Sequence, residues 1–218
     1  MHMLAGNIWP SLDNLFPMRK SHFQETDLAT GVIIQETYRL NGRRHRDPKE
    51  GPAEIVRDSE TGVILCQDYL WHGRLHREDG PARTDHVSTR EFVHIQEEYW
   101  LKGKRHRDPR QGPAQIHRDV GTGVVFSETY WENGRVHRDP ADGPASIGRD
   151  VTTGRIDSEA YWVQGEMHRD PTVGPASIMY DPVTGNIIRE TYCVHGKVIA
   201  PPHRPTPSVG GLRKHPSP

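Results

Sequence analysis

The sequence contains only two cysteines, Cys66 and Cys193, among its 218 residues. Their spacing matches no zinc motif, and two cysteines cannot build the disulfide framework of a small secreted domain. This usage is typical of a reducing compartment, and we expect a cytoplasmic location. The N-terminal stretch has no long apolar core, so it predicts neither a signal peptide nor a transmembrane segment.

Hydrophobic residues are also scarce, at 33%, and the formal net charge is -1. This apolar fraction is low for a protein with a compact two-layer core. A nearly neutral chain has no global attraction to nucleic acid or to an anionic membrane. The 21 glycines and 18 prolines, together with the absence of helical periodicity, argue against long helices. An elongated β-architecture is the better prediction.

Internal repetition is what the sequence has in abundance. A tyrosine recurs every 30 or 31 residues, a glycine follows each tyrosine after four residues, and a histidine follows the first five after seven. Each of these histidines precedes an arginine, and Gly-Pro-Ala follows. The two leading columns are Tyr38, Tyr69, Tyr99, Tyr130, Tyr161 and Tyr192, and His45, His76, His106, His137 and His168.

The stretch "SETYWENGRVHRD" predicts a β-hairpin that turns at Asn-Gly. If Asn133 and Gly134 form the turn, Tyr130 lies opposite His137 and Trp131 opposite Val136. A glutamate two residues before most tyrosines shares the tyrosine side. We therefore expect a structural ladder of Tyr, His and Glu with one rung per repeat. The fold class is all-β: an elongated meander of tandem hairpins in one twisted, mostly single-layer antiparallel sheet.

The chain divides into three parts. Residues 1–26 are expected to cap the first sheet edge, with Trp9, Leu15, Phe16 and Phe23 packing over it. Residues 27–200 hold five full units and a truncated sixth, in which Ile199 replaces the histidine. Residues 201–218 are predicted to be a disordered tail. The proline-containing loop of each unit is expected to bend the chain toward the next hairpin.

A tyrosine, often followed by tryptophan, then x-x-Gly and x-x-His, resembles the MORN repeat. The resemblance covers about residues 27–199 and is carried in one unit by Tyr130, Trp131, Gly134 and His137. Arg138 stands where the family usually has glycine, and the period of about 31 is longer. The form with His-Arg-x-x-Gly-Pro-Ala is similar to MORN-like variants in bacterial, phage and large-virus proteins. The resemblance implies stacked hairpins and a role as a scaffold or binder of proteins or membranes.

The repeated His-Arg-Asp does not predict an active site. One catalytic centre needs a unique constellation, and no Gly-rich loop, Walker motif or HExxH accompanies it. The histidines would lie roughly 10 Å apart on successive units, too far to share one zinc ion. We expect no enzyme activity, no metal and no cofactor, and neutral imidazoles that bond to the backbone or to glutamate.

Two columns are candidates for binding. Arginines follow the histidines and include Arg107, Arg138 and Arg169, but an aspartate follows most of them and predicts local neutralisation. Tryptophan follows the tyrosine only in the middle units. A tryptophan stripe on an open sheet is typical of a protein interface, although folded-over loops are an equal alternative. The tryptophan column is Trp100, Trp131 and Trp162.

We therefore predict a non-enzymatic scaffold that binds another, unidentified protein through its sheet, with the three tryptophans as anchors and Arg107, Arg138 and Arg169 giving orientation. A bacterial or viral effector, or an immunity or inhibitor protein, is one form of this hypothesis. The alternative is electrostatic binding of nucleic acid or acidic phospholipid through the arginine stripes.

Overall fold

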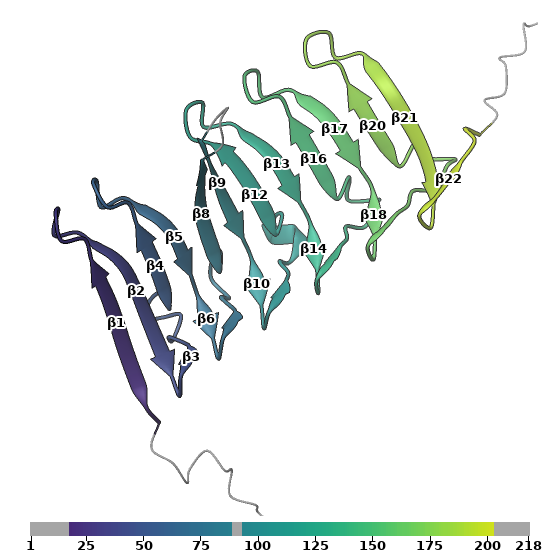
Figure 1. Cartoon of the computed structure of the whole chain (residues 1–218). Coiled ribbons are helices and arrows are strands. Elements are labelled where there is room, and N and C mark those ends of the chain that lie inside the picture. Colours follow the sequence, from purple (N-terminus) through teal and green to yellow (C-terminus); the bar gives the residue numbers. More distant parts are fainter. Residues whose placement is uncertain (1–17, 89–92, 203–218) are drawn as a thin grey trace, which may run out of the picture.

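The computed structural model describes residues 18–88 and 93–202. In these residues, 13 strands follow one another in a single antiparallel meander that does not close into a barrel. Figure 1 shows the strands side by side in one long layer, from β1 at one end to β22 at the other. The predicted fold class is confirmed. No helix in the described ranges is long and apolar enough to cross a membrane.

Each full unit contributes two strands to this main sheet. The strands are β1 (Lys20–Thr26), β2 (Ile33–Leu40), β4 (Glu54–Arg57), β5 (Ile64–Asp68), β8 (Arg83–Ser88), β9 (Val93–Glu98), β12 (Gln115–Asp119), β13 (Val125–Thr129), β16 (Ser146–Arg149), β17 (Ile156–Ala160), β20 (Ser177–Tyr180), β21 (Ile187–Val194) and β22 (Lys197–Ile199).

Every unit also carries a short hairpin beyond its tyrosine, which we call the tip hairpin. The predicted register is confirmed in the fourth unit, where Trp131 pairs with Val136 and His137 N–H donates to the carbonyl of Tyr130 at 3.1 Å. The further strands of these hairpins are β3 (Arg43–Arg44), β6 (Leu70–Trp71), β7 (Arg74–Leu75), β10 (Trp100–Leu101), β11 (Lys104–Arg105), β14 (Trp131–Glu132), β15 (Arg135–Val136), β18 (Trp162–Val163) and β19 (Glu166–Met167).

The tip turns have two residues, and both have positive φ, as at Asn133 (51°) and Gly134 (87°). This is the type I′ geometry that matches the right-handed twist of the strands. Glycine is therefore needed at the second position, whereas the first position holds asparagine, histidine, lysine or glutamine. The sequence prediction of a two-residue turn is right, but β6–β7, β10–β11, β14–β15 and β18–β19 form separate small sheets below the main one.

The opposite turns connect the main-sheet strands, and in the described residues an aspartate caps five of them: Asp27, Asp58, Asp119, Asp150 and Asp181. Asp150 accepts hydrogen bonds from the N–H and the Oγ1 of Thr153 at 2.7 and 2.8 Å. Equivalent pairs join Asp27 to Thr30 and Asp58 to Thr61. These Asx-type caps explain the recurrent Thr-Gly pair. They also show that the aspartates of this column serve the turn backbone.

In the first, third, fourth and fifth units, the loop after the tip hairpin uses the whole His-Arg-Asp-Pro sequence. The guanidinium of Arg138 lies 4.2 Å from the centre of the Tyr130 ring and donates to the carbonyl of Pro144 at 3.1 Å. Asp139 caps the loop by accepting from the N–H of Ala141 at 2.9 Å. Gly143 has φ 118°, and a Cβ there would lie 3.2 Å from Arg138 Nη1. Local conformation and close packing therefore account for most of the motif.

The alanine of Gly-Pro-Ala marks the tightest packing in the molecule. Ala53, Ala82, Ala114, Ala145 and Ala176 are all 0% exposed. Each alanine lies opposite the tyrosine of its own unit, as the bond from Tyr130 N–H to the carbonyl of Ala145 shows. No large side chain in the described part is less than 2% exposed, so the core is a thin strip rather than a central mass.

The first edge of the sheet is formed by β1, which pairs with β2 over its whole length. All seven residues of β1 are exposed, including Phe23 at 56%. Phe23 therefore does not pack over the edge as expected. Trp9, Leu15 and Phe16, with most of the expected capping segment, lie outside the described residues, as do residues 203–218 of the expected tail.

Candidate protein-interaction surface

The two faces of the tip hairpins have different chemistry. Tyrosine, histidine and the arginine that follows it lie on one side, which we call the tyrosine face. The residue after each tyrosine points to the other side, the tryptophan face, because side chains alternate along a strand. The tip strand on the far side of each hairpin adds a residue to the same face, as Val136 does opposite Trp131.

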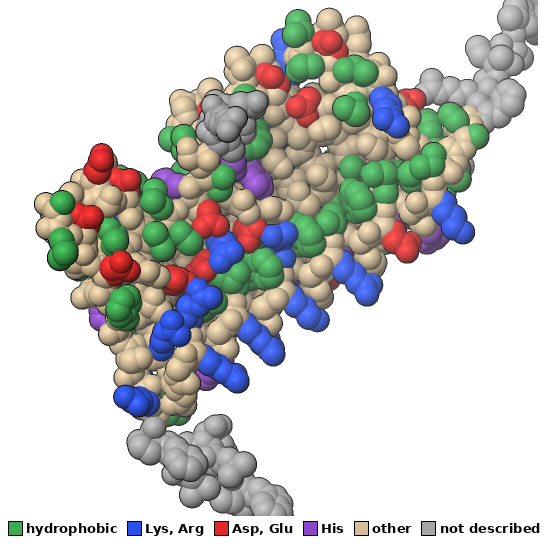
Figure 2. All heavy atoms as spheres, in the orientation of Figure 1, with side chains coloured by type: hydrophobic (Ala, Val, Ile, Leu, Met, Phe, Trp, Pro, Cys, Tyr) green, Lys and Arg blue, Asp and Glu red, His purple; other side chains and the backbone are tan. Residues whose placement is uncertain are grey.

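A band of apolar side chains runs along the tryptophan face across five units. Leu70 and Cys193 are buried, the three tryptophans are half-buried, and Val198 is 73% exposed. Figure 2 shows this band as hydrophobic side chains running along the lower part of the sheet. We call it the tryptophan band: Leu70, Leu75, Trp100, Trp131, Val136, Trp162, Met167, Cys193 and Val198.

Hydrogen bonds between neighbouring tip hairpins hold the strands of the band side by side. The N–H of Gly165 donates to the carbonyl of Val136 at 2.8 Å, and the N–H of Arg138 donates to the carbonyl of Trp162 at 3.2 Å. The strand that carries Val136 thus lies between those that carry Trp131 and Trp162. Because the same bonds recur at each boundary, the side chains of the band are held at a fixed spacing.

The N-terminal half of the tryptophan face is polar. Glu98, only 3% exposed, accepts from Arg105 at 2.5 Å, from the Trp100 indole N–H at 2.9 Å and from Gln96 at 2.6 Å. Arg105 lies over both Trp100 and Trp131, 5.0 and 4.6 Å from their ring centres. Trp100 is therefore fixed in an ionic cluster, whereas Trp131 and Trp162 make no indole hydrogen bond within the described residues.

A row of basic side chains borders the band along the hairpin tips. These residues directly follow the turn glycines, and they are all exposed. Figure 2 shows the row of Lys and Arg side chains below the hydrophobic band. Glu166 takes this position in the fifth unit and interrupts the row. The basic tip row consists of Arg43, Arg74, Lys104, Arg135 and Lys197.

The predicted orienting arginines lie elsewhere. Arg107, Arg138 and Arg169 are half-buried on the tyrosine face, 3.8–4.2 Å from the ring centres of their own tyrosines. They do not flank the tryptophan column. Sequence reasoning selected the arginine after the histidine and missed the basic residue after the turn glycine, although Gly-Arg or Gly-Lys recurs at five of the six turns.

The histidines occupy the positions expected of a structural ladder, and their bonds cross unit boundaries. Nδ1 of His106 accepts from the N–H of Asn133 in the next unit at 3.3 Å, and Nδ1 of His45 accepts from His72 at 3.0 Å. The predicted bond from imidazole to backbone is confirmed. Equivalent bonds involve His76, His137 and His168.

The predicted glutamate rungs bind arginine in several units. Arg57 reaches Glu36 of the same unit at 2.6 Å, and Arg149 reaches Glu128 at 2.5 Å. These two arginines are thus neutralised by the glutamate on the neighbouring strand. The aspartates that directly follow them, Asp58 and Asp150, cap the turns instead.

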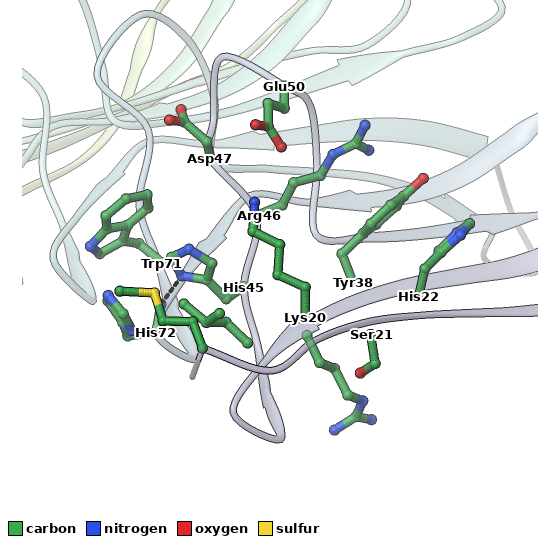
Figure 3. A pocket seen from close by; sticks show the side chains of 13 residues that line it. Lys20, Ser21, His22, Tyr38, His45, Arg46, Asp47, Glu50, Trp71 and His72 are labelled. Carbon is green, nitrogen blue, oxygen red and sulfur yellow. Dashed lines mark hydrogen bonds between the residues drawn. The ribbon is translucent and has the colours of Figure 1, made fainter. Parts of the chain in front are cut away.

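The first unit also has a pocket on the tyrosine face, with a volume of about 550 Å³. Figure 3 shows His22 stacked on Tyr38, with 4.2 Å between ring centres, and Trp71 beside His45 at 4.4 Å. The carboxylates of Asp47 and Glu50 lie across from the Trp71 ring. Tyr38 and His45 are the first rung of the ladder, whereas His22 comes from β1 and Trp71 from the second unit.

Other reactive groups are held in unreactive states. Burial and the side chain of Asp85 raise the pKa of the Cys66 thiol, which keeps it protonated and weakly nucleophilic. Within residues 18–88 and 93–202, no three His, Cys, Asp or Glu side chains are placed to hold a metal ion.

Comparison of the chain with protein-family models, with curated proteins and with solved structures finds no match. The function must therefore be argued from the geometry of this surface alone.

Proposed function

We propose that the protein is a non-enzymatic repeat scaffold that binds another protein through the tryptophan band. The observation that carries the proposal is a regularly spaced band of partly exposed apolar side chains with a basic row beside it, on a chain that is only 33% hydrophobic. Apolar surface kept accessible at a regular spacing is typical of interaction sites, and tryptophan is the residue most enriched among binding anchors.

The use of the repeated polar residues supports a non-enzymatic role. In each full unit the histidine bonds to the next hairpin and the arginine packs on its tyrosine, as His106 and Arg107 do. Aspartates such as Asp108 cap loops. Groups that resemble catalytic residues in the sequence are thus engaged in holding the units together.

A binding experiment with matched variants tests the proposal. Val198 belongs to the band and is 73% exposed, so Val198→Asp should leave folding intact while placing a charge on the surface. Val183→Asp is the control, because Val183 is 77% exposed in a turn away from the band. Proteins captured from the native cell by the wild type and by V183D, but lost with V198D and W162A, would support the interface. Equal capture by all four would contradict it.

The alternative function is electrostatic binding of nucleic acid or acidic phospholipid, and the basic tip row is the observation that favours it. Neutralising phosphates releases counterions, so such binding falls steeply with salt. Replacing Arg74, Lys104 and Arg135 with glutamine should abolish it, whereas V198D should change it little. Binding that resists salt and depends on the band would favour the protein partner.

A further inference from the structure

We infer that the free edge of β21 binds an extended segment of a partner protein as one more strand of the sheet, and that this segment has the pattern Ile-x-Arg. The inference goes beyond the proposed function, because it concerns the end of the sheet and not the tryptophan band. It is carried by the five equivalent edges inside the molecule, which show what kind of strand fits there, and by a glutamate on β21 that has no partner within the described residues.

The far side of β21 is paired only at its C-terminal end. β22 pairs with residues 192–194, and no described strand lies beside residues 187–191 on that side. Figure 1 shows β21 as the last long strand of the layer. Ile187 and Ile188 are 54% and 63% exposed. The edge therefore presents apolar side chains together with backbone groups that no described strand pairs, which is the usual condition for strand addition.

In the five earlier units, the next strand along the chain covers the equivalent edge. The register is the same each time, and the residue two before the tyrosine lies opposite an isoleucine in four of the five units. The five pairs are Glu36–Ile55, Gln67–Thr84, Glu97–Ile116, Glu128–Ile147 and Glu159–Ile178. The first member of each pair is half-buried, whereas Glu190, at the same position of β21, is exposed.

The charge of Glu190 favours a basic residue in the added strand. In the fourth unit, Arg149 follows Ile147 by two residues and lies 2.5 Å from Glu128. The first unit contains the same ion pair at 2.6 Å. Glu190 has no hydrogen bond or ion pair within the described residues. A segment with isoleucine opposite Glu190 and arginine two residues later would reproduce both contacts of the earlier units.

A second copy of the chain does not supply this pattern from the other end of the sheet. The strand there is β1, which has Gln24 at the isoleucine position and Thr26 at the arginine position. Six of the seven residues of β1 are polar, as is usual for an edge that stays unpaired. β1 would leave Glu190 without a cation, so the occupant that fits the edge is another protein.

Alternation of the backbone groups gives the added strand a signature of its own. The N–H of Tyr130 donates to the carbonyl of Ala145 at 2.8 Å, which places the N–H of Ile147 toward β13 and that of Gly148 away from it. A peptide in the same register on β21 uses the N–H of its isoleucine for the new ladder, whereas the N–H of the next residue faces solvent.

The test uses fluorescence anisotropy with the full chain. The probe is a labelled peptide with the sequence of residues 145–151, ASIGRDV. We expect saturable binding. A methyl group on the isoleucine nitrogen should weaken it at least about tenfold, because that N–H faces β21, and the same group on the glycine nitrogen should change it less than about twofold.

A charge reversal connects the binding to Glu190. Glu190→Arg should weaken the peptide about tenfold, and a peptide with glutamate in place of its arginine should bind E190R more tightly than it binds the wild type. Glu60→Arg makes the same change in an exposed turn away from β21 and should leave binding unchanged. Circular dichroism melting confirms that each variant is folded.

Several outcomes would overturn the inference. They are no binding of the unmodified peptide, equal loss with both methylations, or unchanged binding to E190R. Sedimentation of the wild type adds another: a dimer that E190R dissociates would assign the edge to a second copy. The proposed function fails separately, because it is tested by capture of cellular proteins with V198D and W162A, and neither substitution lies on β21.

Discussion

Nδ1 of His106 accepts a hydrogen bond from the N–H of Asn133, 3.3 Å away, across the boundary between two repeat units. The acceptor nitrogen must be unprotonated, so this contact selects the neutral imidazole with its proton on Nε2. The repeated histidine is thus a joint between neighbouring tip hairpins. Because units contact mainly their neighbours, the stability of the array depends on such joints.

Replacing this histidine should weaken the array without abolishing the fold. His106→Ala leaves the N–H of Asn133 without its acceptor, and we expect a loss of about 1–2 kcal/mol in the free energy of unfolding. His106→Asn keeps an acceptor near the Nδ1 position and should recover part of it. Urea unfolding followed by circular dichroism measures both. An unchanged midpoint for H106A would show that the joint is not stabilising.

Arginine stacking on tyrosine should be specific for the guanidinium. Arg138 lies 4.2 Å from the centre of the Tyr130 ring and donates to the carbonyl of Pro144. Arg138→Lys keeps the charge but loses the planar group and its second contact, so we expect about 1–2 kcal/mol lower stability. Arg135→Lys, in the exposed tip row, is the matched control and should change stability little.

A separate measurement tests the role predicted for Arg138 in partner binding. If the arginine mainly contacted a partner, R138K would reduce capture of that partner at an unchanged melting temperature. The packing on Tyr130 predicts the reverse, a lower melting temperature with capture retained below it. The two quantities measured on the same preparation decide between these roles.

The turn aspartates should make the protein sensitive to acid. Hydrogen bonds from the side chain and the backbone of Thr153 lower the pKa of Asp150 below its ordinary value, and threonines lower the pKa of Asp58 and Asp119 in the same way. A lowered folded-state pKa contributes stability above the ordinary value of about 4 and loses it as pH falls through the folded-state value. The melting temperature should therefore drop as the pH falls below about 4.

A single substitution tests the origin of this acid sensitivity. Asp150→Asn keeps an oxygen that can accept from Thr153 but does not titrate. Its melting temperature should be somewhat lower than that of the wild type at neutral pH and should fall less as the pH drops below about 4. Parallel curves for the two proteins would contradict the assignment to the turn caps.

The alanine column should not accept a larger side chain. Ala145 is 0% exposed and follows Pro144, whose carbonyl binds Arg138. Ala145→Leu requires the loop and the neighbouring strand to separate, and we expect a loss of about 1–3 kcal/mol. Ala141→Leu, in the exposed part of the same loop, is the control. Thermal melting of both variants gives the comparison.

Several features were predictable from the sequence because they depend on local chemistry. Two-residue spacing and glycine at the turn predicted that Trp131 pairs with Val136, and alternation then placed tyrosine and tryptophan on opposite faces.

What could not be predicted depends on contacts between units. The sequence shows His-Arg-Asp as three consecutive polar residues, yet His106 bonds forward to the next hairpin, Arg107 folds back on its own tyrosine, and Asp108 caps its loop. The spacing of the three residues does not show in which direction each side chain points. For the same reason the sequence predicted Arg138 beside the tryptophans, whereas Arg135 is the basic residue at the hairpin tip.

The sequence by itself determined the repeat, the turn positions, the pairing register within each hairpin and the all-β class, because glycine conformation and side-chain alternation act over a few residues. Only the tertiary structure decided which polar groups form contacts between units and which side chains stay accessible to solvent. Burial is set by the neighbouring unit, about 31 residues away in the chain: Arg105 of the third unit lies over Trp100 of its own unit and over Trp131 of the next.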